Sequence, residues 1–523
     1  MSLNIFENES DESIDQLEEM RLINEDQIKD TFLIKLYFYY IHKGYFNIIS
    51  TQIVNILITV FIFLFLLFMS MCINFSGLFD LEDKGEFSDY IDWNNIFKLN
   101  ITGWLFTSIF LIFLFCRILS LIDDIKEYFP IRKFYNSRLF INDIQLTTTK
   151  WEAIVNKLSE ITDCKYINVY NVSSKIMAKD NYLISLIDNK IINLNYMTKL
   201  MEWNIKFCII NTIFSNNKIN LKLFKNTINF NKIINIKLKV VSIVNFLFMP
   251  LIIMFIFFYN IFKYGEVFYN NPELISSRNW TLMAKWHIRE YNEMYHLFHE
   301  RLAKSNILAN EYINQFPSKI LETFSKLILF VSSSILLLFI FLTIINENLL
   351  INLNVTESRP ILWYIGILGS IIAVTKGIIK NKMIFYPKEK LTEIQKNINF
   401  IPDEWVNNAE RIYVKNQFTK LFEYQIKSLL KELFFITTTP FELWTISNNV
   451  EDIVNYFIEN TVYEPHIGYK CSDAIFKPYL EDNPNTKKKI NNSIKNFKLI
   501  HPDFAENHFY NNDSVQFNIR NNF

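Results

Sequence analysis

The chain has 523 residues, of which 50% are hydrophobic, and its 53 basic residues balance 53 acidic ones, so the formal net charge is zero. A neutral chain gives no electrostatic argument for nucleic-acid binding. The five cysteines form no C-x-x-C, so the sequence gives no evidence for a zinc ribbon or a disulfide framework. The nine glycines form no G-x-G, so it gives none for a dinucleotide-binding loop.

The apolar residues gather in runs of about twenty, the length that crosses a hydrocarbon core about 30 Å thick. Residues 1–30 are acidic and polar, and residues 31–50 are aromatic and amphipathic, which is typical of a helix at the membrane interface. The first span is predicted at 53–73 and the second at 101–122. The segment between them, 74–100, has six acidic residues but only two lysines, so we expect it outside the cytosol and both termini inside.

Residues 140–239 have the composition of a cytosolic helical insertion. Residues 240–262 are long enough to span, but Pro250 at their centre removes a backbone donor, and lysines are frequent on both flanks. We interpret this segment as re-entrant, entering the membrane and returning to the same side. The following stretch, 277–302, is amphipathic at helical spacing and predicts one helix in which Arg289 and Glu293, four residues apart, pair.

The third and fourth spans are predicted at 324–345 and 361–379. In the fourth, Gly369, Ala373 and Gly377 recur every four residues, a small-residue stripe that favours close helix packing or an oligomer contact.

A second cytosolic helical region follows. Within it, the apolar segment 429–444, with Pro440 near its end, predicts a second re-entrant element. The last residues, 481–523, are rich in asparagine and lysine without periodicity and predict a mobile tail.

These patterns give an all-α polytopic membrane protein with four transmembrane helices, two re-entrant helices and cytosolic helical regions. Its expected parts are an acidic N-terminus, an interfacial helix with spans one and two, a cytosolic insertion, a re-entrant segment with the amphipathic helix, spans three and four, a C-terminal helical region and a polar tail. Their bounds are 1–30, 31–139, 140–239, 240–323, 324–379, 380–480 and 481–523.

Enzyme chemistry finds little support in the sequence. His296, His299 and Glu300 could present two imidazoles on one face, but no third metal ligand is in register. No Ser/His/Asp or Cys/His set has a supporting motif, so we expect no covalent chemistry, no metal and no cofactor. Lys376 lies in the fourth predicted span, where a cation is costly unless it faces a cavity, a headgroup, a partner or the interface.

Several ordered motifs resemble the autophagy-related protein 9 family, and the resemblance runs from about residue 31 to 476. They are Tyr37, His42, Gly44 and Tyr45; Asp180-Asn181-Tyr182-Leu183-Ile184; Leu200 to Asn204; Ser277-Arg278-x-Trp280; Ala284-x-Trp286; Arg289-Glu290-x-Asn292-Glu293; His296-x-Phe298; Arg301-Leu302; Pro402-Asp403-x-Trp405; and Phe418-x-x-Leu421-Phe422-x-Tyr424.

The resemblance implies a domain-swapped homotrimer that acts as an ATP-independent phospholipid scramblase of autophagosome-forming membranes. It also implies phospholipids, a lipid-transfer protein and autophagy-initiation factors as partners, at the phagophore, Golgi-derived membranes and cytoplasmic vesicles. The alternatives are a vesicle membrane scaffold that recruits such proteins without moving lipid, and an ion channel.

Candidate residues of the lipid pathway follow from location and charge. One departure from the family is the uncharged Tyr269-Asn270-Asn271 before Pro272, where members can carry a charged triplet; Lys263 and Glu266 are the nearby charges. The candidates are Arg278, Lys285, Arg289, Glu290, Glu293, Arg301, Thr375 and Lys376.

Overall fold

The computed structural model is mainly helical, with short two-stranded pairings, and forms two compact units. The first runs to Ile176 and includes Asn216–Lys218 and Pro465–Ile467; the rest of the chain forms the second. The described residues are 30–74, 90–93, 95, 101–162, 167–192, 196–215, 217–270, 277–316, 319–347, 349–352, 354–356, 359–378, 385–465, 467–476, 488–502 and 504.

Aromatic packing holds the first unit together. The Tyr135 hydroxyl donates to the carbonyl of Leu36, 2.9 Å away, and the rings of Phe63 and Phe110 stack 3.7 Å apart. These contacts join the helices over 30–41 and 45–67 to the helix over 101–137. The helices are α2 (Asp30–Ile41), α3 (Tyr45–Leu67) with a π-helical end (Phe68–Cys72), α5 (Ile101–Ser137), α6 (Trp151–Thr162) and α7 (Val169–Ile176), with a 3₁₀ turn at Gln145–Thr147.

The second unit begins with α8 (Ala178–Asp188), α9 (Lys199–Ile205) and its π-helical continuation η5 (Lys206–Ile210), α10 (Asn211–Ile213), β1 (Phe214–Ser215), α11 (Lys222–Lys225) and α12 (Thr227–Asn270). The short strand β2 (Lys218–Ile219) lies between α10 and α11. A central group follows: β3 (Arg278–Trp280), α13 (Leu282–Ile288), α14 (Tyr295–Asn314), α15 (Lys319–Ile345), α16 (Leu349–Asn352), β4 (Asn354–Thr356), β5 (Arg359–Pro360) and α17 (Ile361–Ile378).

The C-terminal elements are α18 (Pro387–Asn397), α19 (Asp403–Asn407), α20 (Ile412–Leu421), β6 (Phe422–Tyr424), α21 (Gln425–Asn448), α22 (Val450–Glu459), β7 (Thr461–Glu464), β8 (Gly468–Cys471), a 3₁₀ turn (Ser472–Ala474) and α23 (Lys488–Ile500). Strand β3 pairs antiparallel with β6, Arg278 opposite Tyr424, and β4 with β5 and β7 with β8 are also antiparallel. A buried cluster that includes Trp280, Phe418 and Phe422 forms the core at the β3–β6 pairing.

Within the part of the chain that the structure describes, three helical stretches are long and apolar enough to cross a membrane: Tyr45–Cys72, Thr227–Phe262 and Glu322–Ile345. Ile361–Lys376 is a shorter apolar helix. The predicted second span, 101–122, forms the first part of α5. Four spans therefore remain a prediction.

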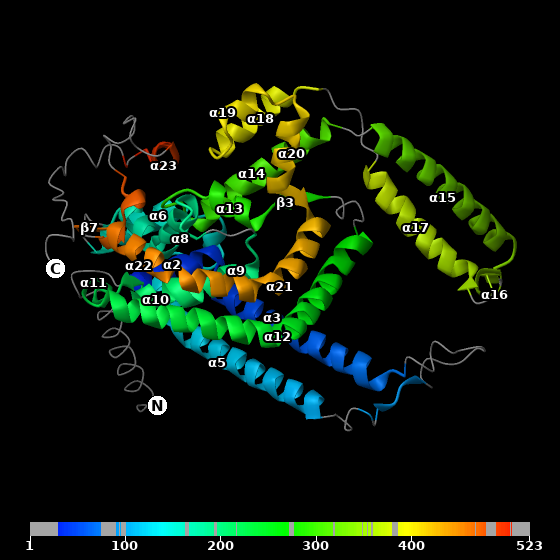
Figure 1. Cartoon of the computed structure of the whole chain (residues 1–523), viewed down its shortest axis with the longest axis horizontal. Helices are drawn as coiled ribbons and strands as arrows, with labels where there is room; N and C mark the ends of the chain where they lie inside the picture. Colours follow the sequence, from blue (N-terminus) through cyan, green and yellow to red (C-terminus); the bar gives the residue numbers. More distant parts are fainter. Residues whose placement is uncertain are drawn as a thin grey trace, which may run out of the picture. The chain divides into compact units, whose positions relative to one another are not determined.

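The segment predicted as re-entrant, 240–262, is part of one 44-residue helix, α12, with Pro250 inside it. Figure 1 shows this helix changing direction part-way along its length. Helix α21, which contains Pro440, packs beside it: the Ser242 hydroxyl donates to the carbonyl of Pro440 (2.6 Å), and the Asn235 amide donates to that of Ser447 (2.9 Å). The two elements predicted as re-entrant are thus a packed pair.

The prediction of a single helix over 277–302 is wrong. Strand β3 comes first, Thr281 then caps α13 by accepting from the Ala284 N–H, and the chain is extended at Arg289 before α14 begins. Asn292 has a left-handed backbone (φ 55°), which cannot continue a right-handed helix. Side-chain hydrogen bonds replace those of a helix here, as Glu293 accepts from the N–H of Glu290 at 3.0 Å.

The prediction of a mobile tail over 481–523 is wrong for Lys488–Ile500, which is helix α23. Ile490, Ile494 and Phe497 are buried along one face. Their spacing of four and three residues was a readable helix signal among the asparagines and lysines. The remaining parts of that prediction fall mostly outside the described residues.

Candidate functional site

Arg289 is held by an acidic partner from another helix. Its guanidinium lies 3.1 Å from the carboxylate of Asp180 in α8, and the Tyr295 hydroxyl donates to the same carboxylate. Burial raises the pKa of Asp180, but Arg289, Lys206 and the Tyr295 hydrogen bond outweigh burial and leave the pKa below its ordinary value. Asp180 is therefore a buried carboxylate that stays charged.

A second buried group joins the extended segment to α14. Arg301 grips Glu293 with two hydrogen bonds of 2.6 and 2.7 Å, and its guanidinium lies 3.7 Å from Glu290. Glu290 also accepts from the amides of Asn399 and Asn496 at 2.8 and 2.7 Å. Burial, helped by the charge of Glu293 and opposed by Arg301, raises the pKa of Glu290. The predicted pairing of Arg289 with Glu293 is thus wrong, because each has a different partner.

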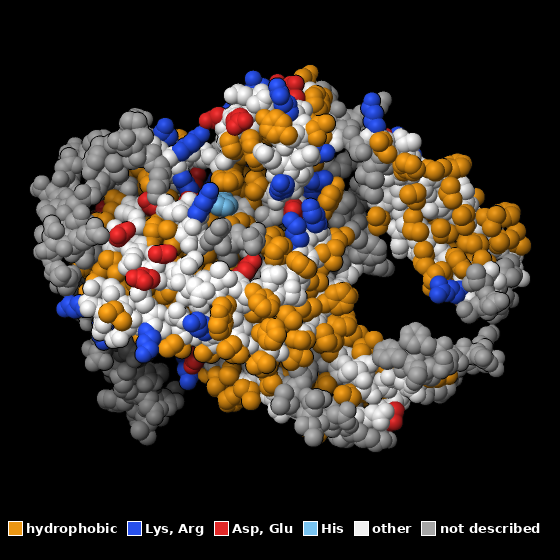
Figure 2. All heavy atoms as spheres, viewed as in Figure 1, with side chains coloured by type: hydrophobic (Ala, Val, Ile, Leu, Met, Phe, Trp, Pro, Cys, Tyr) orange, Lys and Arg blue, Asp and Glu red, His pale blue; other side chains and the backbone are white. Residues whose placement is uncertain are grey.

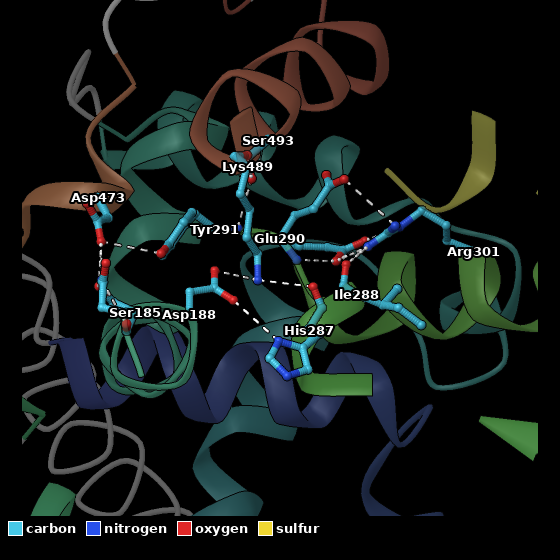
Figure 3. A network of polar contacts seen from close by, with 12 residues as sticks. Ser185, Asp188, His287, Ile288, Glu290, Tyr291, Arg301, Asp473, Lys489 and Ser493 are labelled. Carbon is cyan, nitrogen blue, oxygen red and sulfur yellow. Dashed lines mark hydrogen bonds and ion pairs between the residues drawn. The ribbon is translucent and has the colours of Figure 1, made fainter. Parts of the chain in front are cut away.

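Helix α23 closes over the same segment (Figure 3). Lys489 lies 2.7 Å from Asp188 and donates to the carbonyl of His287 at 3.1 Å, and the Tyr291 N–H donates to the Ser493 hydroxyl at 3.2 Å. Burial lowers the pKa of Lys489 and Asp188 opposes this shift. The helix that sequence reasoning missed is therefore tied to the segment by charge and hydrogen bonds.

Asn292 fixes the turn in the extended segment. Its N–H and its side-chain oxygen bond to the amide of Asn181, at 2.9 and 2.8 Å, and its own amide donates to the carbonyl of Ala474 at 2.8 Å. The side chain has no solvent exposure. An asparagine suits this place because it tolerates the left-handed backbone and satisfies its neighbours' hydrogen bonds.

The structure brings four of the predicted pathway residues together: Arg289, Glu290, Glu293 and Arg301. Sequence reasoning missed Asp180, the partner of Arg289, since pairing between distant segments leaves no local spacing to read. It also missed two contacts beside them, the pair of Asp188 with Lys489 and the hydrogen bond from the Tyr291 hydroxyl to Asp473.

Other candidates lie elsewhere. Arg278, in β3, stacks on the Tyr424 ring with its guanidinium carbon 3.9 Å from the ring centre. Lys285, in α13, is half-buried, and burial with the nearby Lys199 lowers its pKa. The side chains of Tyr269, Asn270, Lys263 and Glu266, and all of Asn271, lie outside what the structure describes.

Thr375 and Lys376 belong to a different place, the pairing of α15 with α17. Thr375 is buried and Lys376 is exposed. Among the described side chains of α15, the two that are buried are Ser325 and Ser332, seven residues apart on one face. We call Ser325, Ser332 and Thr375 the hydroxyl seam, since they are buried hydroxyl-bearing residues of two helices that pack against each other.

One position of the small-residue stripe of α17, Gly369, has open space beside it. A Cβ added at Gly369 would meet no atom within 4 Å, and Ala373 is half-buried. The described residues thus leave space beside Gly369, and its role with Ala373 and Gly377 in packing against another copy stays a prediction.

Comparison with known proteins gives one consistent result. A family model described as "Autophagy protein ATG9" matches residues 26–477. Autophagy-related protein 9 of Kluyveromyces lactis is 31% identical over 488 residues, covering 88% of this chain and 53% of the relative, so the chain spans about half that relative's length. The Schizosaccharomyces pombe relative is 30% identical over 484 residues, covering 87% and 68%.

A solved structure agrees. The cryo-EM structure of Schizosaccharomyces pombe Atg9 superposes with a TM-score of 0.65 at 28% identity, over 86% of this chain and 98% of that one. With matches over most of its length in family, sequence and structure, the chain belongs to the autophagy-related protein 9 family.

Proposed function

We propose that this protein is an ATP-independent phospholipid scramblase of autophagosome-forming membranes. In this proposal it acts as a homotrimer with both termini in the cytosol, and lipid-transfer and autophagy-initiation proteins are its partners. Membership of a family of autophagy proteins and helices long enough to cross a membrane support it. No covalent chemistry is required, since the substrate changes leaflet without changing bonds.

The observation that carries the proposal is the hydroxyl seam. A helix pair in lipid needs no polar contact, because apolar side chains pack there at no desolvation cost, whereas an unpaired polar group in hydrocarbon costs several kcal/mol. Ser325, Ser332 and Thr375 are nevertheless buried, in two helices that pack against each other. If the two helices part slightly, these hydroxyls offer hydrogen bonds to a headgroup that crosses, with Lys376 at one end to meet its phosphate.

The charged candidates around the extended segment have a structural role in this proposal. Arg289, Glu290, Glu293 and Arg301 already satisfy one another or Asp180 inside one chain. A charge that lines a path must exchange its partner for each headgroup that passes, and a paired, buried charge does so only at high cost. We propose that this network holds α8, α14 and α23 in place beside the membrane helices.

The test is a leaflet-exchange assay on protein in liposomes with fluorescent phospholipid in both leaflets. A membrane-impermeant reductant should bleach well beyond the outer leaflet's share, without ATP and without leakage. The variant Ser332→Ala/Thr375→Val removes two hydroxyls of the seam at nearly constant volume. The control Ser334→Ala/Ser370→Ala removes two hydroxyls of the same helices that are exposed; like the Thr375 hydroxyl, each is bonded to a carbonyl of its own helix.

The seam variant should slow exchange several-fold and the control should leave it unchanged. Bleaching that stops at the outer leaflet in correctly assembled wild-type protein would contradict the scramblase proposal and favour the alternative, a vesicle membrane scaffold. Equal exchange rates in both variants would mean that the protein scrambles lipid along a path that does not use the seam.

A further inference from the structure

The first half of helix α12 has two different faces. Phe230, Ile234 and Leu238 are buried against the rest of the unit. On the opposite side an unbroken apolar stripe is exposed, continuing without interruption into the apolar run that follows; it consists of Ile233, Ile236, Val240, Ile243 and Leu247. Figure 2 shows hydrophobic side chains gathered over this part of the molecule, around α12 and α21. The stripe starts before residue 240, where the continuous apolar run begins.

The start of the stripe lies before the apolar run 240–262. Lys237 and Lys239 stand directly before this run, and a charge within the hydrocarbon is costly. Residues 233–239 are therefore expected at the level of the headgroups of one leaflet, whether the helix beyond Pro250 crosses the membrane or returns to the same side.

The residues around this level are aromatic and basic. In η5 and the helix before it, Trp203 and Phe207 are 59% and 42% exposed and stack with ring centres 5.1 Å apart. The Lys237 ammonium lies 6.0 Å from the Phe207 ring centre, and the Lys239 ammonium lies 5.5 Å from that of Trp444, which is 46% exposed. Lys237 also donates to the Thr212 hydroxyl at 2.9 Å, which positions its charge.

We propose that Trp203, Phe207, Lys237, Lys239 and Trp444 form an anchor site that binds anionic phospholipid headgroups of one leaflet. Indole and phenyl rings favour the interfacial layer, and lysines there attract acidic headgroups. The two ammonium groups reach the phosphate level while the rings enter the glycerol region beside them. This site fixes the depth of α12 and α21 and enriches acidic lipid beside them, whether or not the protein scrambles lipid.

The first arm of the test measures depth. A bimane label is attached at Phe207→Cys in a Cys116→Ala/Cys164→Ala background, because the other three cysteines, Cys72, Cys208 and Cys471, are buried; the background without Phe207→Cys serves as the blank. The matched control is Ile307→Cys on α14, where Ile307 is 64% exposed. In nanodiscs of phosphatidylcholine and phosphatidylserine, headgroup-level nitroxide lipid should quench the label at 207 at least threefold more than the label at 307, and aqueous iodide should do the reverse.

The second arm measures lipid choice. Lys237→Gln/Lys239→Gln should reduce phosphatidylserine co-purified with the protein several-fold, whereas Lys415→Gln/Lys420→Gln, with the same change of charge on α20, should not. Iodide quenching at 207 without lipid quenching would place this face in water and overturn the proposal. Protection from both quenchers would show that protein, such as a second copy, covers it, and equally overturns it. Leaflet exchange is measured separately, so failure here is distinct from failure of the scramblase proposal.

Discussion

The guanidinium of Arg289 lies 3.1 Å from the carboxylate of Asp180, and the two side chains are 6% and 8% exposed. This ion pair connects α8 to the extended segment between α13 and α14. Two desolvated charges repay their burial only when both are present and well hydrogen-bonded. Tyr295 completes the arrangement by donating to Asp180 while its ring lies 4.2 Å from the guanidinium carbon.

Removing one partner of this pair should destabilise the protein. We expect Arg289→Met to lower the free energy of unfolding by about 3–5 kcal/mol, because it leaves Asp180 charged and buried without its cation. The double variant Arg289→Met/Asp180→Leu should lose less than the sum of the two single changes. Denaturant unfolding of the detergent-solubilised protein measures both.

An exposed pair supplies the control for that measurement. Lys304 lies 2.7 Å from Glu300 on the surface of α14, where each side chain is more than half exposed. Lys304→Met should cost less than about 1 kcal/mol. Equal losses for Arg289→Met and Lys304→Met would contradict a structural role for the Arg289–Asp180 pair.

The sequence predicts the long apolar helices better than it predicts the segment 277–302. Apolar runs predicted helices long enough to cross a membrane, and three described helices are long and apolar enough to do so, because burial in lipid demands a long uniform pattern. The same periodicity misled over 277–302, where apolar residues at helical spacing pack into a broken chain whose turn is fixed by Asn292. Arg289 and Glu293 are predicted to pair, but Arg289 pairs with Asp180 in α8, which no local spacing reveals, and Glu293 pairs with Arg301 across the break between the extended segment and α14.

Acid should weaken the Asp180 contact. The pKa of Asp180 in the folded protein lies below its ordinary 3.8, so the unfolded chain takes up the proton first as the pH falls. The stability that this carboxylate contributes is therefore complete above pH 3.8 and is lost as the pH falls from there through the folded pKa. Unfolding curves from neutral pH to below 3.8 should be flatter for Asp180→Asn, although this variant starts from a lower stability.

Glu290 should contribute a pH dependence of stability opposite to that of Asp180. Its pKa is raised above the ordinary 4.5 by burial, so the folded state binds this proton more tightly than the unfolded state does. The contribution of its protonated form is complete below pH 4.5 and declines as the pH rises through the folded pKa. If Asp180→Asn and Glu290→Gln changed the pH slope in the same direction, the assignment of charges in this network would be wrong.

Substitution of two neighbouring lysines of α23 should have very different effects on hydrogen exchange. Lys489→Ala breaks the bonds to Asp188 and to the His287 carbonyl, so the extended segment over Tyr291 should exchange its amide hydrogens faster. Lys488→Ala removes only an exposed contact with Asp403, and hydrogen exchange there should stay as in the wild type. Hydrogen–deuterium exchange of peptides covering 287–294 measures the difference; identical protection in both variants would rule out α23 as a support of this segment.

Gly44 should tolerate no side chain. Its backbone has φ +111°, and an added Cβ would lie 2.8 Å from Cγ of Asp143, which also accepts a hydrogen bond from Tyr39. Gly44→Ala should therefore cost at least about 1–2 kcal/mol for the backbone alone, together with displacement of Asp143. Gly366→Ala is the control, since a Cβ there meets nothing within 4 Å and the residue lies inside α17. Thermal unfolding should show a lower midpoint for Gly44→Ala only, and an unchanged midpoint would mean that the turn between α2 and α3 relaxes without loss.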